Sequence, residues 1–280
     1  ALCALAVWKP EPAFSVTALD VGQGDCLAVQ ADGLHFLVDG GSSDESRVGK
    51  YRILPYLKQQ GIRRLEGIFL THPDADHWNG LRELLLSAAD RETQLQAENL
   101  FLPEWMRGTE EERELTEPAE MAGMTVRYLC AGDEIRTENC RIEVLYPGRG
   151  QRVEAGEENS ASLVLGIHFG EADILLTGDL EGEGEEKLTE SLGRYEYLKV
   201  AHHGSRNSTG IPFLEAVRPE ICVISAPEHS VYGHPHEEVL ERIRQSGGKI
   251  FCTADCGAVR AVSDGHKIEV FTFLSEYDIL

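Results

Sequence analysis

The sequence predicts a layered α/β fold in which two β-sheets are covered by outer helices. The first half of the chain shows mainly strand patterns, whereas the second half alternates strands with helices. The 280 residues are 42% hydrophobic and 26% charged, which is typical of a globular protein with a substantial core. No linker rich in Pro, Gly or Ser divides these patterns, so we expect one domain.

Short apolar runs bounded by turn residues predict the strands of the first half. A turn at Asp32-Gly33 joins two of them into a hairpin. Helical character covers residues 47–60 and returns at Trp78. The polar stretch 90–121 predicts an insertion with some helix. The predicted strands are 15–19, 26–29, 34–38, 67–70, 125–129, 141–145, 162–169 and 173–176.

In the second half, strands and helices take turns along the chain. A last hairpin turns at Asp264-Gly265. The predicted helices are 181–192, 211–217 and 236–245, and the predicted strands are 197–201, 221–225, 249–252, 258–262 and 267–273.

The run Thr71-His72-Pro73-Asp74-Ala75-Asp76-His77 carries the strongest chemical signal. It follows the predicted strand 67–70 and precedes a predicted helix, at the kind of strand end where layered α/β proteins bind ligands. Two imidazoles and two carboxylates in six residues can hold a divalent metal ion. The alternative is a solvated loop that happens to be rich in His and Asp. The order of strand, ligands and helix favours the metal site.

Other residues that can bind metal also follow predicted strands. Any one of them alone is more often a cap, a turn residue or a surface residue. Several together, each after an apolar run, indicate one site at one edge of the sheets. These residues are Asp39, Asp179, His202, His203, His234 and His236.

The formal net charge of −22 argues against a protein that captures nucleic acid over a broad basic surface. Acidic runs at 110–120 and 181–190 are expected to be solvated helix faces. Basic residues cluster between 47 and 64, and Lys199 and Arg206 flank the later histidines. We expect a local basic rim that could guide one phosphate at a time.

The seven cysteines do not show a structural zinc spacing. Cys130–Cys140 and Cys252–Cys256 are candidate disulfides if the chain lies outside the cytoplasm; otherwise they are buried thiols. Residues 1–8 are apolar but too few to span a bilayer. They fit either the end of a transmembrane helix, with Trp8 and Lys9 at its interface, or an N-terminal core segment.

The combined motifs resemble the metallo-β-lactamase superfamily of metallohydrolases, which implies an αββα sandwich. More narrowly, they resemble the ComEC family of bacterial DNA-uptake membrane proteins, whose C-terminal part is such a domain. The resemblance covers about residues 14–273. Its motifs are Asp20-Val21-Gly22-Gln23-Gly24-Asp25, the run from Thr71 to His77, Thr177-Gly178-Asp179, Ala201-His202-His203-Gly204-Ser205, Tyr232-Gly233-His234-Pro235-His236 and Cys256-Gly257-Ala258.

This resemblance implies the division of the chain and its location. Residues 1–13 would be the end of a membrane-helix stub and a linker, and residues 14–280 the metallo-β-lactamase-like domain. The domain is expected on the outer face of the bacterial cytoplasmic membrane, as part of a larger membrane protein. Its expected partners are DNA and the rest of a membrane-embedded DNA-uptake channel. No soluble nucleotide cofactor is expected.

The resemblance also implies roles for individual residues. The first metal ion would be held by His72, Asp74 and Asp179, and the second by Asp76, His77, Asp179 and His203. Asp76 and His202 are assigned to catalysis, His234 and Ser205 to substrate contact, and Asp39 to orienting a ligand. If the strand continued through His202 and His203, their side chains would point to opposite faces, which favours His203 as the ligand.

The sequence departs from the superfamily pattern at two places. Asp74 stands where the superfamily usually has His. Residues 159–163, which match the usual third motif, contain no His, and His168 lies six residues deeper in its strand. Oxygen in place of nitrogen favours Mn²⁺ over Zn²⁺ for the two expected divalent ions, with Mg²⁺ also suited to such a site.

The function that follows is metal-dependent hydrolysis of DNA phosphodiesters, with the non-transported strand of natural transformation as substrate. One alternative keeps the fold and changes the substrate to an envelope polymer, a small nucleotide or a lactam. Another is a non-catalytic, metal-stabilised module of the uptake channel.

Overall fold

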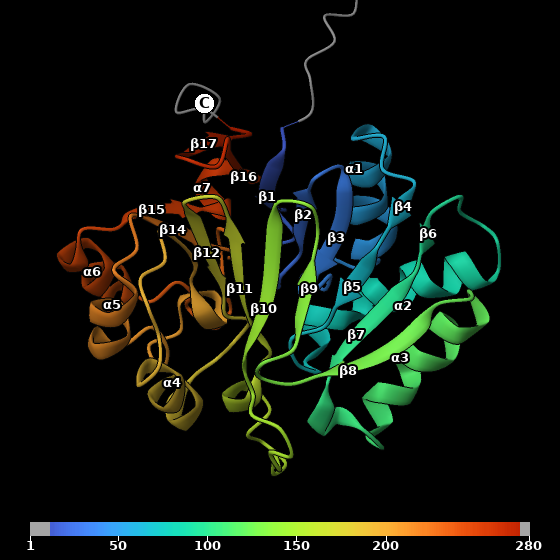
Figure 1. Cartoon of the computed structure of the whole chain (residues 1–280), viewed down its shortest axis with the longest axis horizontal. Coiled ribbons are helices and arrows are strands. Elements are labelled where there is room, and N and C mark those ends of the chain that lie inside the picture. The colour runs from blue at the N-terminus through green and yellow to red at the C-terminus, as the bar shows by residue number, and fades with distance from the viewer. Residues whose placement is uncertain (1–11, 275–280) are drawn as a thin grey trace, which may run out of the picture.

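The computed structural model describes residues 12–274. Two sheets stack face to face, and helices cover both outer faces, which confirms the expected αββα sandwich (Figure 1). The expected membrane-helix stub at residues 1–8, with Trp8 and Lys9, lies outside the described residues. Within residues 12–274, no helix has the length and apolar character needed to cross a membrane.

The first sheet has eight strands in the order β17-β16-β1-β2-β3-β5-β7-β8. Its first part is antiparallel, and β3, β5, β7 and β8 run parallel to one another. The strands are β1 (Phe14–Ala18), β2 (Leu27–Ala31), β3 (Leu34–Val38), β5 (Gly67–Phe69), β7 (Asn99–Pro103), β8 (Thr125–Leu129), β16 (Val259–Ser263) and β17 (Ile268–Thr272). A separate pair joins β4 (Arg64–Leu65) to β6 (Gln96–Ala97).

The second sheet has seven strands in the order β15-β14-β13-β12-β11-β10-β9. Here β12, β13, β14 and β15 are parallel, whereas β9, β10, β11 and β12 are antiparallel neighbours. The strands are β9 (Glu134–Arg136), β10 (Cys140–Tyr146), β11 (Val164–Phe169), β12 (Ala172–Leu176), β13 (Tyr197–Lys199), β14 (Ile221–Ile224) and β15 (Lys249–Cys252).

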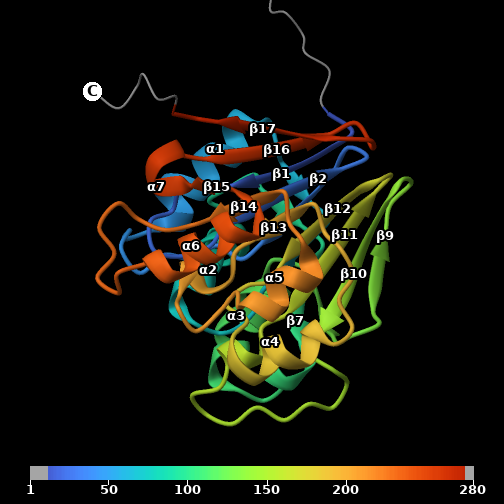
Figure 2. The same ribbon diagram turned by 90° about the vertical axis from the view of Figure 1, so that its left-hand side faces the viewer.

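The helices cover the two outer faces separately, as the two views show (Figures 1 and 2). On the first sheet lie η1 (Gly49–Ile53), α1 (Leu54–Gln59), α2 (Ala75–Ala89) and α3 (Glu110–Met121). On the second lie α4 (Gly182–Thr189), α5 (Ile211–Val217) and α6 (Glu237–Ser246). Shorter turns are η2 (Glu104–Met106), η3 (Asn159–Ala161), η4 (Ala201–Gly204) and α7 (Thr253–Cys256). Between the sheets, aromatic rings such as Phe14 and Phe169 stack at a centroid distance of 5.2 Å.

The structure corrects the prediction at two places that matter for the site. The stretch 90–121 is not merely an insertion, because it contains β7, which lies between β5 and β8 in the first sheet. The strand predicted at 197–201 ends earlier, at Lys199, and the chain then turns through η4. The histidine pair therefore lies on a turn and not on a strand.

The described cysteines are free thiols, so Cys130–Cys140 and Cys252–Cys256 are not disulfides in this structure. Burial, together with the nearby charge of Asp32, raises the pKa of Cys140 to about 12. Burial likewise raises the pKa of Cys252 to about 11. These side chains behave as small apolar groups of the core.

Candidate metal centre

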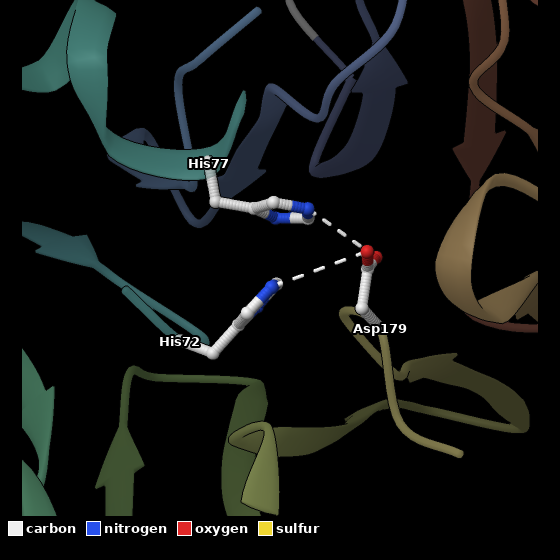
Figure 3. A group of neighbouring side chains, drawn as sticks. All are labelled: His72, His77 and Asp179. Carbon is white, nitrogen blue, oxygen red and sulfur yellow. Dashed lines mark ion pairs between the residues drawn. The ribbon is translucent and has the colours of Figure 1, made fainter. Parts of the chain in front are cut away.

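Strand ends from both sheets meet at one edge of the sandwich. Parallel β3 and β5 of the first sheet deliver Asp39 and His72 just beyond their carboxyl ends. Parallel β12 and β13 of the second sheet deliver Asp179 and His203. Figure 3 shows the Asp179 carboxylate facing the rings of His72 and His77. A site at the carboxyl ends of parallel strands is what the sequence predicted.

The first turn of α2 brings His77 into this group and is held by backbone packing. Gly40 N donates to the carbonyl of His77 at 2.8 Å, and Asp25 N donates to the carbonyl of Asp76 at 3.1 Å. A Cβ atom added to Gly41 would lie 2.4 Å from the backbone carbonyl carbon of Asp76. Only a residue without a side chain fits there, so the glycine loop presses directly on the helix backbone.

Asp39 orients two of the histidines. His77 Nδ1 donates to Asp39 Oδ2 at 2.9 Å. The Thr71 hydroxyl donates to the same oxygen at 2.8 Å and lies 3.0 Å from His72 Nδ1. A carboxylate only accepts, so the Thr71 proton is committed to Asp39 and its oxygen receives the proton of His72 Nδ1. This arrangement leaves the Nε2 lone pairs of both rings facing the gap.

His203 is fixed in the same sense from the second sheet. Its Nδ1 donates to the backbone carbonyl of Ser225 at 3.0 Å. The Nε2 atoms of His72, His77 and His203 then lie 4.0, 3.3 and 3.5 Å from the nearest Asp179 oxygens. Within residues 12–274, these three Nε2 atoms and Asp179 Oδ1 are buried and make no hydrogen bond.

Buried polar atoms without a partner are costly, so their convergence calls for a ligand that satisfies all of them. Imidazole nitrogens and carboxylate oxygens are metal ligands, and a divalent cation fits this set. The residues present therefore fit a divalent metal ion, and a metal site is what the sequence predicted here.

The acid–base behaviour of the cluster reflects the same close packing of opposite charges. Burial would raise the pKa of Asp76, but the imidazole of His203, whose Nε2 lies 3.5 Å from the carboxylate, and that of His77 lower it to about 2. Burial would also raise the pKa of Asp179, but His77 and His203 hold it well below its usual value. For His77, burial acts to lower the pKa, but Asp179 and Asp39 raise it well above its usual value. A bound cation would take the place of the imidazole protons.

The ligand atoms form overlapping groups, which is consistent with two neighbouring metal positions. Among residues 12–274, each group places three ligand atoms within 4.8 Å of one another. The groups are His72, His77 and Asp179; Asp76, His77 and His203; Asp25, Asp179 and His203; and Asp25, Asp39 and His77. Asp74 is outside these groups. Its half-exposed carboxylate lies 3.6 Å from His72 Nε2, at the rim of the site.

Both histidines of the pair reach the site. Neighbouring side chains point to opposite faces only on a strand, but His202 and His203 have left-handed backbone angles, with φ of 49° and 53°. His202 Nε2 lies 3.7 Å from Asp179 Oδ2, and its Nδ1 donates to Glu181 at 2.8 Å. Its side chain is 23% exposed and that of His203 only 1%. His203 is thus the enclosed member and His202 the accessible one.

The two residues predicted to contact substrate lie in different surroundings. The His234 ring is 5.4 Å from that of His202, between the centre and the surface. Its partial burial and the charges of His202 and His203 lower the pKa of His234 to about 4. Ser205 is buried and ends the η4 turn, where its N–H donates to the carbonyl of His202 at 2.8 Å. Its position indicates a role in shaping the turn.

Sequence reasoning missed a buried ion pair beside the cluster. Lys199 was expected on a basic rim, but it is fully buried and donates to Asp25 Oδ2 at 2.8 Å. The other Asp25 oxygen lies 3.9 Å from His203 Nδ1. Asp25 belongs to a recognised motif and Lys199 precedes the histidine pair, but 174 residues separate them in sequence. Glu181 was likewise expected on a solvated helix face, but it holds His202.

Comparison with known proteins places this geometry in a family context. The sequence profile of the metallo-beta-lactamase superfamily matches residues 19–229. The chain is 29% identical over 279 residues to ComE operon protein 3 of Bacillus subtilis, covering 94% of this chain and 34% of that protein. It is 30% identical over 256 residues to competence protein ComA of Neisseria gonorrhoeae, covering 90% of this chain and 32% of that protein.

The chain therefore spans about a third of the length of these curated relatives. Among solved structures, the metallo-beta-lactamase fold protein YhfI of Bacillus subtilis is similar, with a TM-score of 0.58 and 11% identity. That alignment covers 85% of this chain and 96% of YhfI. At this identity the similarity concerns the fold alone.

Proposed function

The chain belongs to the metallo-β-lactamase superfamily, and on this premise we propose that it is a metal-dependent phosphodiesterase that hydrolyses DNA. One observation carries the proposal. The Nε2 atoms of His72, His77 and His203 converge on Asp179, and among the described residues none of the three has a hydrogen-bond partner. Two divalent ions in such a site would supply Lewis-acid polarisation of a phosphodiester and a lowered pKa of water.

The protein's own residues divide the remaining work. His72, His77, His203 and Asp179 would hold the ions, with Asp76 and Asp74 completing the set from the start of α2. His202 faces Asp179 from the accessible side, where its Nε2 can bond a phosphate oxygen or pass a proton to the leaving oxygen. Glu181 fixes the tautomer and the direction of that ring.

DNA is the proposed substrate because the chain is similar to a protein named for competence. We propose that the domain degrades the non-transported strand at the outer face of the cytoplasmic membrane, beside the rest of a DNA-uptake channel. A net charge of −22 opposes unaided capture of a polyanion, which suits an enzyme that receives its substrate from a neighbouring channel.

We propose Mn²⁺ as the working ion. Carboxylates approach the histidines from Asp74, Asp76 and Asp179, so the donor set is mixed and rich in oxygen. Oxygen ligands suit Mn²⁺ better than they suit Zn²⁺, which favours nitrogen and sulfur.

The test uses the 280-residue chain, stripped of metal and reloaded with Mn²⁺, Mg²⁺ or Zn²⁺, with metal content measured on each sample. Labelled DNA should be cut with Mn²⁺. His72→Ala and Asp74→Ala should abolish cutting, whereas His266→Ala should not, because that histidine is exposed on the β16–β17 hairpin. Undiminished cutting by His72→Ala would refute the site.

Further outcomes separate the alternatives. Restoration by Zn²⁺ but not by Mn²⁺ would overturn the choice of ion. Hydrolysis of a small nucleotide, an envelope polymer or a lactam without hydrolysis of DNA would redirect the substrate. Bound metal with no turnover, and with DNA binding retained in His72→Ala, would favour a non-catalytic docking module.

A further inference from the structure

The loop between β14 and α6 carries two exposed large hydrophobic side chains, and one of them is connected through His234 to the metal centre. Tyr232 is 58% exposed and Val231 is 84% exposed. Single exposed hydrophobic residues are common on protein surfaces, but the Tyr232 ring stacks on His234, which contacts His202 of the metal centre. The proposed hydrolysis of phosphodiesters gives this ring no role.

Two hydrogen bonds connect the backbone of Tyr232 to Gln23, which lies in the loop between β1 and β2 of the first sheet. The Tyr232 N–H donates to Ser230 Oγ at 3.2 Å, and the Ser230 hydroxyl donates to Gln23 Oε1 at 2.8 Å. Gln23 is buried, and its side-chain amide lies 3.4 Å from His234 Nδ1. These hydrogen bonds therefore hold the backbone of Tyr232 in place, while its ring remains exposed to solvent.

A row of rings connects Tyr232 to the metal centre. The Tyr232 ring stacks on His234 at a centroid distance of 5.8 Å and an angle of 29°. The His234 ring meets that of His202 edge-on at 5.4 Å, and His202 Nε2 lies 3.7 Å from Asp179 Oδ2. The row thus runs from an exposed aromatic face to the place where a phosphate would be held.

We propose that Tyr232, backed by His234, forms a nucleobase subsite for single-stranded DNA. This inference rests on the proposed function. A sugar joins each base to its phosphate, so a strand with one phosphate at the metal centre would carry a neighbouring base outward along the row. Exposed aromatic rings bind successive bases by stacking, without regard to sequence.

The charge of the chain strengthens this assignment. With a net charge of −22, binding of a nucleic acid cannot rely on many phosphate contacts. Stacking is available to a protein of any charge. In a duplex the base faces are covered by their neighbours, so the subsite selects strands whose bases are free.

The test compares Tyr232→Ala with Tyr51→Ala, since Tyr51 is equally exposed, at 59%, but lies on η1 over the first sheet. The probes are a short single-stranded oligonucleotide and the same strand with abasic sites, each labelled and mixed rapidly with the 280-residue chain in Mn²⁺, so that binding is measured before hydrolysis. Tyr232→Ala should weaken binding of the normal strand by roughly five- to 150-fold, the range for loss of one base–aromatic stack. Tyr232→Phe and Tyr51→Ala should bind as wild type.

The abasic strand should bind wild type and Tyr232→Ala equally. Equal losses on both strands, or no loss on either, would overturn the subsite. The two proposals fail differently: if wild type does not hydrolyse the strand, the proposed function fails, but the same titration still measures stacking. Absence of single-strand binding by wild type would also overturn the subsite.

Discussion

Two buried groups of charges lie side by side in this protein, and they are balanced in opposite ways. In the closed pair, Lys199 and Asp25 are both fully buried, and Lys199 Nζ neutralises Asp25 through its Oδ2 at 2.8 Å, while Asp25 Oδ1 faces His203. In the open cluster, three imidazole nitrogens and Asp179 Oδ1 face one another, and none of them has a hydrogen-bond partner in the part of the chain that the structure describes. His203 links the two groups, since its Nδ1 lies 3.9 Å from Asp25.

This difference separates a buried charge that serves the structure from a buried cluster that serves binding. A charge whose counterion belongs to the chain is satisfied as soon as the protein folds. A cluster of ligand atoms without partners is completed only by something taken from solution. Removing a member of the closed pair should therefore affect folding, whereas removing a member of the open cluster should affect binding.

The largest expected effect is on the closed pair. Lys199→Met leaves the Asp25 carboxylate buried without a counterion, which should lower the free energy of unfolding by about 3–5 kcal/mol. Urea unfolding of the metal-free chain measures this loss. Lys187→Met, at an exposed ion pair with Glu183, should cause no measurable change. Asp25→Leu combined with Lys199→Met should recover most of the stability. A Lys199→Met variant as stable as wild type would show that the ion pair is not needed for folding.

The next effect belongs to the open cluster. Mn²⁺ at about 100 times its dissociation constant should raise the free energy of unfolding by about 2.7 kcal/mol, because the folded chain binds it and the unfolded chain does not. Asp179→Asn should remove this gain, since Asp179 faces all three histidines. Thermal unfolding with and without Mn²⁺ checks both statements, and a gain that persists in the variant would contradict them.

A smaller effect is expected one step away from the ligands. Thr71→Val breaks the chain of hydrogen bonds from Asp39 to His72, so metal affinity should fall by about 10–100-fold. Thr71→Ser keeps the hydroxyl and should bind metal like wild type. Competition with a chelator measures the affinities. Equal affinities for the Val and Ser variants would mean that the relay does not orient His72.

The smallest effect is expected at the accessible histidine. Glu181→Gln weakens the hold on His202 Nδ1, but water can replace part of it because the ring is 23% exposed. We expect at most about a tenfold loss of kcat/KM on DNA, the lower end of the range for such partners. Metal affinity should not change. A parallel loss of metal affinity would place His202 among the ligands.

The fold was predictable where the signal is local. Strands such as β3 and β8 and the helix α5 lie where the apolar patterns placed them. In contrast, β7 was missed, because its few apolar residues follow a long polar stretch and its place between β5 and β8 depends on distant partners.

For the site, the sequence indicated which ligand types follow which strands. The structure places most of those side chains at one edge. The sequence could not indicate that Lys199 is buried, because lysine is usually exposed and its partner Asp25 is 174 residues away. The sequence also could not reveal the left-handed turn at His202 and His203. That turn forms because β13 ends at Lys199, before the histidine pair.

The contact of Gly41 with the first turn of α2 has a consequence for the choice of ion. Backbone rests on backbone there, so the backbone of His77 is held in one place and does not shift away from a larger cation or toward a smaller one. A metal site whose ligands are held at fixed positions would distinguish cations by their ionic radius. Ca²⁺ prefers ligands at about 2.3–2.6 Å and Mg²⁺ at about 2.0–2.1 Å, so one rigid spacing cannot suit both. Because Gly41 has no side chain, its backbone can fix the position of α2, and that fixed position would determine which cation radius fits the site.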